Sequence, residues 1–274
     1  MSDSVGEPAR LEIRALEVQV EGKQILSGID LSIPRGEVHA LMGPNGAGKT
    51  SLGYAVMGHP KYEVTGGDVL WKGRSLLGML PEARARMGLF LSLQYPTAIP
   101  GVTTVNFLRA ALKGQGKELP ARQFLDLIRK EVAALKMDPS FMSRYINDNF
   151  SGGEKKRMEI VQLAVLRPDM AILDETDSGL DVDALRTVAD GVNRVRRDGM
   201  GILIITHYQR ILDYVVPDRV HVMAAGRVVA SGGGELVDRI EKDGYDPILR
   251  EAGVEQGVAA VSAGSPGENT RKQV

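Results

Sequence analysis

The chain of 274 residues contains no cysteine, which excludes disulfides and any zinc or iron–sulfur cluster held by its own thiolates. It also has no run of about eighteen apolar residues, so no segment is suited to span a bilayer. Neither sign of charge is in excess, because 34 Lys and Arg face 35 Asp and Glu. This balance disfavours a general binder of nucleic acid or of membrane surfaces. Residues 1–10 lack an apolar signal core, and we expect a cytoplasmic protein.

The order of strand and helix signals predicts an α/β fold whose mostly parallel sheet has helices on both faces. Alternating apolar and polar residues predict a hairpin over 11–26, turning at Glu21-Gly22, and another over 67–76 with its turn near Gly73. Further strands are predicted at 38–42, 89–94, 170–174 and 202–207, and a terminal hairpin at 220–230. Helices are predicted at 49–58, at 153–167 and from about Asp183.

Between these α/β segments lies a stretch of different character. From about residue 103 to 145, apolar residues recur at three- and four-residue spacing, which is typical of amphipathic helices: Phe124, Leu127, Ile128, Val132 and Leu135. We therefore predict a catalytic core formed by 11–94 and 154–253, with a helical subdomain over 95–153. Residues 1–10 are expected to be flexible, and the polar, glycine-rich residues 254–274 to form a disordered tail.

A glycine-rich stretch directly after the predicted strand 38–42 matches the pattern G-x-x-x-x-G-K-[ST]. Such a loop curls so that its N–H groups, together with the start of the next helix, converge on a polyphosphate. Lys49 would reach the β- and γ-phosphates, and the Thr50 hydroxyl would bind Mg²⁺. A chance glycine-rich turn is the alternative, but the flanking strand and helix make it the weaker one. The predicted ATP-binding residues are Gly43, Pro44, Asn45, Gly46, Ala47, Gly48, Lys49, Thr50 and Ser51.

Polar residues lie at the carboxyl ends of three other predicted strands. In parallel sheets, binding sites form at this end of the strands. Asp174 is suited to hold the Mg²⁺ shell, and Glu175 to orient or deprotonate an attacking water. Gln94 could contact the metal or the water, and His207 the γ-phosphate. Taken alone, Gln94 would be a solvated loop residue and His207 a structural histidine. Beside a phosphate loop we predict Glu175, His207 and Gln94 as catalytic residues, and Thr50, Gln94 and Asp174 as metal ligands.

The segment 150-FSGGEKKR-157 resembles the signature motif of ABC ATPases, and 178-SGLD-181, His207 and Gln94 resemble the family's D-loop, H-loop and Q-loop. Six motifs in the family's order, from residue 43 to 207, make the resemblance specific. It implies the ABC ATPase fold, with an N-terminal antiparallel β region and an inserted helical subdomain that carries the Q-loop and the signature. It also implies a head-to-tail dimer formed on ATP, in which four residues contact nucleotide on the second subunit: Ser151, Gly152, Gly153 and Asp181.

Within this family the chain looks like the SufC group, the ATPases of the Suf iron–sulfur cluster assembly system. The discriminating residues are the run 95-YPTAIPGV-102 after Gln94, and Thr176-Asp177 where most ABC ATPases carry Pro-Thr. This resemblance implies an energy-coupling ATPase whose partners are scaffold proteins of the SufB and SufD type, with no nucleic acid and no membrane insertion. We expect the free chain to be a monomer. The alternative is the ATPase subunit of a membrane ABC transporter.

Two departures from the family pattern stand out. ABC ATPases usually stack the adenine on an aromatic residue of the first hairpin, where 18-VQVEG-22 offers only Val20. Because a base–aromatic stack contributes on the order of 1–3 kcal/mol, we expect a modest affinity for ATP. The signature carries Glu154 where glutamine is usual, which predicts a weaker contact across the dimer.

Overall fold

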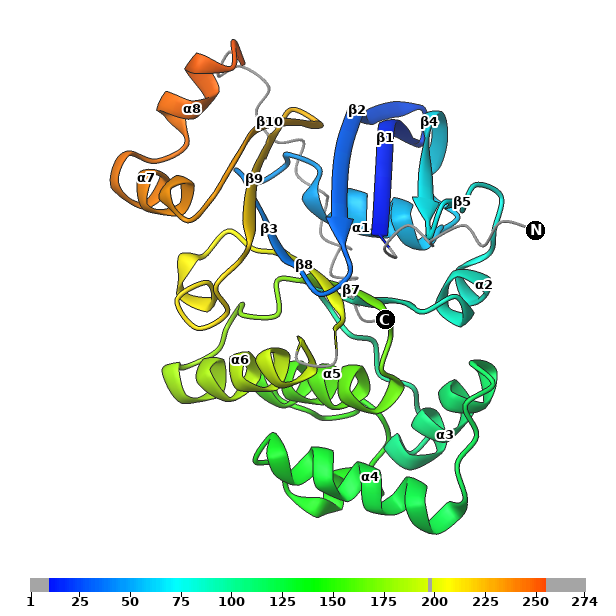
Figure 1. The fold of residues 1–274 in the computed structure, drawn as a ribbon. Coiled ribbons are helices and arrows are strands. Elements are labelled where there is room, and N and C mark those ends of the chain that lie inside the picture. Colours follow the sequence, from blue (N-terminus) through cyan, green and yellow to red (C-terminus); the bar gives the residue numbers. More distant parts are fainter. Residues whose placement is uncertain (1–9, 197–198, 255–274) are drawn as a thin grey trace, which may run out of the picture.

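The computed structural model describes residues 10–196 and 199–254, and it contains two sheets (Figure 1). The smaller sheet is antiparallel, with strand order β2-β1-β4-β5. Its strands are β1 (Arg10–Val20), β2 (Lys23–Pro34), β4 (Glu63–Trp71) and β5 (Arg74–Ser75). The predicted turn of the first hairpin is confirmed, because Glu21 and Gly22 join β1 to β2 with φ of 51° and 76°.

The larger sheet has the order β10-β9-β3-β8-β7-β6. Neighbours from β9 to β6 pair in parallel, and only β10 is antiparallel. The prediction of a mostly parallel sheet is therefore confirmed. Its strands are β3 (Val38–Met42), β6 (Leu89–Ser92), β7 (Met170–Asp174), β8 (Gly201–Ile205), β9 (Arg219–Ala224) and β10 (Arg227–Gly232).

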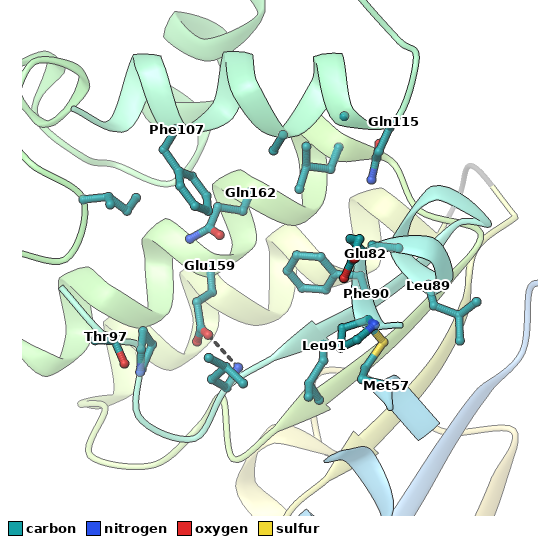
Figure 2. Close-up of a pocket in the computed structure, with 18 of the residues that line it drawn as sticks. Met57, Glu82, Leu89, Phe90, Leu91, Thr97, Phe107, Gln115, Glu159 and Gln162 are labelled. Carbon is teal, nitrogen blue, oxygen red and sulfur yellow. Dashed lines mark hydrogen bonds between the residues drawn. The ribbon is translucent and has the colours of Figure 1, made fainter. Parts of the chain in front are cut away.

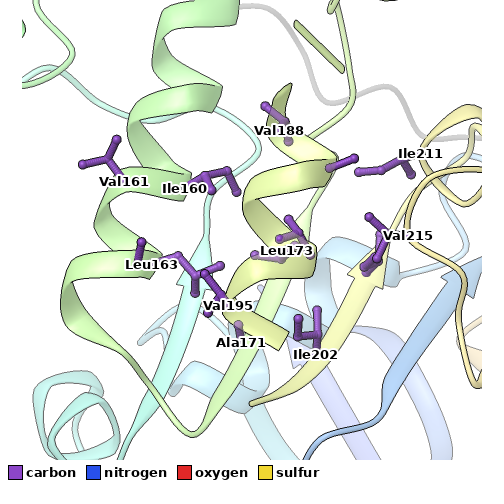
Figure 3. Packing of buried hydrophobic residues seen from close by; sticks show 14 of the residues in the cluster. Ile160, Val161, Leu163, Ala171, Leu173, Val188, Val195, Ile202, Ile211 and Val215 are labelled. Atoms are coloured by element: carbon purple, nitrogen blue, oxygen red, sulfur yellow. The ribbon is translucent and has the colours of Figure 1, made fainter. Parts of the chain in front are cut away.

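Side chains of the parallel strands point alternately to two cores, as the period of a strand requires. On one face, Leu41, Ile172 and Leu203 pack with helix α1 (Lys49–Met57) and the antiparallel sheet. On the other face, Leu173 and Ile202 pack under helices α5 (Gly152–Leu166) and α6 (Val182–Arg196), as Figure 3 shows. Both faces of the parallel sheet are thus covered.

The predicted helical insertion forms α3 (Thr104–Gly114), α4 (Ala121–Ala134) and the short 3-10 helix η1 (Pro139–Met142). Its periodic residues Phe124, Ile128, Val132 and Leu135 are buried in the same core as α5 and α6, and Leu127 packs half-buried at its edge. In Figure 1 these helices lie on the side of the parallel sheet away from the antiparallel sheet.

Several predicted boundaries were wrong. β6 ends at Ser92 and β8 at Ile205, so Gln94 and His207 lie in loops beyond the strands instead of closing them. The ladders explain this, because the neighbouring strand β7 pairs only as far as Ser92↔Leu173 and Asp174↔Ile205. Three α-helices of the described residues were not predicted: α2 (Pro81–Arg86), α7 (Glu235–Asp243) and α8 (Asp246–Glu251). The short 3-10 helix η2 (Gln209–Ile211) was not predicted either.

The predicted flexible start and disordered tail lie outside the described residues, except that Arg10 already belongs to β1 and Val254 ends the described part. Within the described ranges, no helix is long and apolar enough to cross a bilayer.

Candidate active site

The predicted phosphate loop leaves the fully buried strand β3 and ends at α1, which starts at Lys49. Gly43 has φ of 148°, and a Cβ there would lie 2.0 Å from the carbonyl oxygen of Met223. Gly48 has φ of 100°, and a Cβ there would lie 2.9 Å from the Leu26 side chain. Both positions therefore require glycine. A Cβ at Gly46 would meet nothing within 4 Å, so one side of the loop is open to a ligand.

The helix that follows this loop is arranged to attract an anion. Its N-cap, Gly48, provides no side-chain hydrogen bond, and its first turn contains no acidic residue, so no carboxylate of the helix competes for the N–H groups there. Lys49 is buried, and its Nζ donates to the carbonyl oxygens of Gly43 (2.8 Å) and Pro44 (3.1 Å). Burial lowers the pKa of Lys49, while the Glu175 and Asp174 carboxylates counteract this. The loop thus combines the N–H groups at the start of α1 with the Lys49 ammonium group, which the loop's own carbonyl oxygens fix in place.

Asp174, the last residue of β7, is a buried carboxylate. Burial raises the pKa of Asp174 to about 6, against a hydrogen bond from the Thr50 hydroxyl that lowers it. Its Oδ1 has no hydrogen-bond partner among the described residues. The Asp174 carboxylate and the Thr50 hydroxyl together offer oxygen ligands that fit Mg²⁺. This ion takes few protein ligands and completes its coordination shell with phosphate oxygens and water. Among the described residues, no group of three or more histidine, cysteine, aspartate or glutamate side chains could hold a metal ion.

The three residues predicted to be catalytic meet although they come from three separate loops. Glu175 has φ of 48°, in the left-handed region, and its backbone N–H donates to the Ile205 carbonyl at 2.9 Å. Its Oε2 accepts a hydrogen bond from Gln94 Nε2 at 2.6 Å, and its Oε1 lies 3.2 Å from His207 Nδ1. The loops after β6, β7 and β8 therefore deliver one polar side chain each to the same point, at the carboxyl ends of the parallel strands.

Asp177 and Thr206 support this group, and sequence reasoning assigned neither a structural task. Both side chains are buried, and the Thr206 hydroxyl donates to Asp177 Oδ2 at 2.8 Å. The same hydroxyl accepts from the Tyr208 backbone N–H at 2.9 Å, so the chain is held on both sides of His207. The unusual Thr176-Asp177 pair was the available signal.

Tyr245 is a further residue that the sequence did not reveal. It precedes α8, and its hydroxyl accepts a hydrogen bond from the backbone N–H of Gly43 at 3.1 Å. No sequence signal could have found it, because the two residues lie far apart in the chain and a single tyrosine carries no pattern.

The signature motif forms the start of α5. Ser151 is the N-cap, its hydroxyl accepting from the Glu154 N–H at 3.3 Å while Glu154 Oε2 accepts from the Ser151 N–H at 2.7 Å. Glu154 therefore completes a capping box, a task that glutamine also performs. Ser151 and Gly152 are exposed at the surface. So is Asp181, which accepts from the Ala184 N–H at 2.7 Å.

A small cavity of about 220 Å³ joins several of these elements within one chain. It lies between the signature helix and the loops after β6 and β7. The residues that line it are Gln94, Tyr95, Pro96, Gly152, Lys155, Lys156, Glu175 and Ser178. The exposed signature residue Gly152 thus borders the same space as Gln94 and Glu175.

Residues 26–178 match the family model described as ABC transporter. The chain belongs to the ABC transporter family of ATPases. As a member of this family it hydrolyses ATP, with Mg²⁺ as the usual cofactor.

Relatives of this ABC ATPase are similar over most of its length. It is 52% identical to vegetative protein 296 of Bacillus subtilis, over 89% of this chain and 95% of that protein. It is 51% identical to the probable ATP-dependent transporter ycf16 of Cyanophora paradoxa, over 86% and 93%. A solved ATP-binding subunit of an ABC transporter superposes with a TM-score of 0.74 at 25% identity, over 89% of this chain and 99% of that one. The expected ABC ATPase fold is confirmed.

This ABC ATPase has a second, larger cavity of about 600 Å³, between α1 and α2 on one side and α3 and α5 on the other. Its lining is mainly apolar and includes Met57, Phe90 and Phe107. Figure 2 shows Phe107 across the space from Met57. Ile99, which is 38% exposed, and Pro96 bring the loop after Gln94 to the same cavity. We call this space the large cavity.

Proposed function

We propose that this ABC ATPase is a SufC-type protein, the cytoplasmic energy-coupling subunit of an iron–sulfur cluster assembly machinery of the Suf type. The observation that carries the proposal is that the two segments typical of the SufC group, 95–102 and Thr176-Asp177, both lie next to the proposed catalytic residues. Asp177 is buried and, through Thr206, braces the chain around His207. The run 95–102 borders both the large cavity and the small cavity that contains Gln94 and Glu175. Since the chain has no cysteine, a cluster would be carried by partners of the SufB and SufD type.

We assign the chemistry of ATP hydrolysis to the group described above. The loop from Gly43 to Ser51 holds the phosphates, with Lys49 beside the β- and γ-phosphates. When bound, Mg²⁺ neutralises phosphate charge, and Thr50, Asp174 and Gln94 would hold it. Glu175 takes a proton from the attacking water, a role supported by its position between Gln94 and His207. His207 contacts the γ-phosphate.

We further propose that ATP joins two copies head to tail. Ser151, Gly152, Gly153 and Asp181 would contact the nucleotide of the second copy, and the exposure of Ser151, Gly152 and Asp181 supports this. The capping box engages the N–H groups of Ser151 and Glu154, and the N–H groups of Gly152 and Gly153 between them are the ones proposed to face an anion. Val20 provides no ring for the adenine, so the phosphates dominate binding.

The large cavity is the proposed docking site for the scaffold. Its apolar lining fits an apolar segment of a protein partner, and it opens beside the loop that follows Gln94. Tyr95, which is 81% exposed, stands at this loop as a large unpartnered apolar surface. A scaffold seated there would contact the loop that carries Gln94.

The test uses purified chain with SufB- and SufD-type scaffold. We expect the scaffold to bind and to accelerate a slow ATPase, and Ile99→Asp or Tyr95→Asp to weaken binding by more than roughly tenfold, because a charge is buried without a partner. Val216→Asp is the matched control, since Val216 is 65% exposed and lines neither cavity. Wild-type chain that shows no affinity for the scaffold would refute the proposal.

The second candidate is the ATPase subunit of a membrane transporter. It is favoured by the description of the matched family and by the printed name of the Cyanophora paradoxa relative. The same large cavity would then receive a segment of a membrane permease. Co-purification with a permease, together with absence of scaffold binding, would make this candidate the better one.

A further inference from the structure

Helix α5 carries a buried pair of opposite charges that the chemistry above does not use. Lys156 and Glu159 are 5% and 4% exposed, and Lys156 Nζ lies 3.5 Å from Glu159 Oε2. Burial raises the pKa of Glu159, and Lys156 beside it counteracts this. A buried ion pair is costly to desolvate and stabilises a fold less than apolar packing does. The pair therefore invites an explanation other than stability.

Both members of the pair hold the same short stretch of backbone. Glu159 Oε1 accepts from the Leu93 N–H at 2.9 Å. Lys156 Nζ donates to the carbonyl oxygens of Leu93 (3.2 Å) and Gln94 (3.1 Å). Since β6 ends at Ser92, no sheet ladder holds this stretch. The two side chains thus replace the missing ladder bonds at Leu93 and Gln94. The side-chain amide of Gln94 donates to Glu175 at 2.6 Å.

The pair also lies between the two cavities. Glu159 and Leu93 line the large cavity, whereas Lys156 and Gln94 line the small one beside Glu175. Figure 2 shows the Glu159 carboxylate directed to the backbone at the wall of the large cavity. A partner that fills the large cavity would change the surroundings of Glu159, which binds the backbone N–H of Leu93, the residue whose carbonyl Lys156 binds.

We propose that Lys156 and Glu159 are positioning residues that set the Gln94 amide against Glu175, and that a partner in the large cavity adjusts hydrolysis through this pair. The first half concerns this chain alone, and the second rests on the proposed function. The partner would be coupled to the contact between Gln94 and Glu175 through the backbone of Leu93 and Gln94, which the two buried charges hold, with no movement of the phosphate loop required.

The test compares Glu159→Gln with the double variant Lys156→Met/Glu159→Gln, which leaves no unpaired buried charge and so guards against failure to fold. The pair positions Gln94 against Glu175, the proposed general base, whereas the phosphate loop, Thr50 and Asp174 are untouched and keep most of the proposed contacts to ATP and Mg²⁺. We therefore expect kcat without scaffold to fall by roughly tenfold or more, with the Kd for ATP within about twofold of wild type. With scaffold, we expect binding to persist while the fold-acceleration falls towards one.

Glu131→Gln is the matched control. Glu131 is equally buried and pairs with Arg194 at 2.5 Å, but it lines neither cavity. We expect the scaffold to accelerate Glu131→Gln as much as wild type, even if this variant has a lower melting temperature. A loss of acceleration in the Glu159 variants alone is then not an effect of lost stability. An unchanged kcat in both Glu159 variants would overturn the positioning role.

The coupling role has its own outcome. If scaffold binds the Glu159 variants and accelerates them as much as wild type, the proposed route is wrong while the proposed function stands. If wild-type chain binds no scaffold, the proposed function fails, and the comparison of kcat with Kd for ATP still decides the positioning role.

Discussion

Replacing Glu175 with glutamine tests the centre of the proposed chemistry. Glutamine has nearly the shape of glutamate, and the structure allows it to keep both polar contacts of Glu175. The amide oxygen of the new side chain can accept from Gln94 Nε2 where Glu175 Oε2 does now, at 2.6 Å, and its amide nitrogen can face His207 Nδ1, now 3.2 Å from Oε1. Glutamine also adopts φ of 48° at no greater cost than glutamate. We therefore expect the free energy of unfolding of Glu175→Gln to change by less than about 1 kcal/mol.

The loss in rate should be much larger than the loss in stability, because an amide cannot take the proton of the attacking water. General-base catalysis contributes about 10²- to 10⁴-fold, equivalent to roughly 3–5 kcal/mol of the barrier. Binding of ATP should persist, since Lys49 and the loop glycines are untouched. The variant should therefore hold ATP without turning it over.

The assay is single-turnover release of γ-phosphate, with ATP affinity and melting temperature measured on the same preparations. Glu235→Gln serves as a control for removing a carboxylate, because Glu235 starts α7 and lines neither cavity. Turnover of Glu175→Gln within a few-fold of wild type would refute the general-base role.

Three further predictions concern the loop, the dimer and the core. Lys49→Ala should weaken the affinity for ATP, measured by titration calorimetry, because it removes the positive charge from the phosphates. Mixing Lys49→Ala with Gly152→Asp chains on the scaffold should restore activity at about one composite site per dimer. Burial lowers the pKa of His221 from 6.5 to about 4, with His39 and Arg219 adding to this, so the folded state resists protonation. Its contribution to stability is complete above pH 6.5 and is lost towards pH 4, by about 2 kcal/mol between roughly pH 7.5 and pH 5 in urea unfolding.

Each of these has a contrary outcome. Unchanged ATP affinity in Lys49→Ala would contradict the phosphate loop. Absence of recovery at every mixing ratio would indicate sites completed within one chain. His221→Asn should flatten the pH dependence of unfolding, and an equally steep dependence in that variant would assign it to other groups.

The sequence alone was sufficient for the local features of the site. The glycine pattern from Gly43 to Gly48 follows from backbone geometry, since φ of 148° and 100° and close neighbours leave no space for a side chain at its ends. The strands and α4 could likewise be predicted, because burial of one or two faces of an element leaves a periodic pattern of apolar residues in the sequence. The strand ends could not be predicted to the residue, because a strand stops where its neighbour stops pairing. For that reason Gln94 and His207 were placed on strands and lie in loops.

Only the tertiary structure decided which distant groups meet. The bond between Thr206 and Asp177, the contact of Tyr245 with Gly43, and the hold of Lys156 and Glu159 on the stretch before Gln94 all join separate elements. In the sequence the last pair is simply two charges on a helix, whose usual place is a solvated face. Their burial follows from packing α5 against the end of β6, where backbone groups beyond the ladder need partners. Local pattern determines where a chain can turn or bind phosphate, and packing determines which polar groups must satisfy one another.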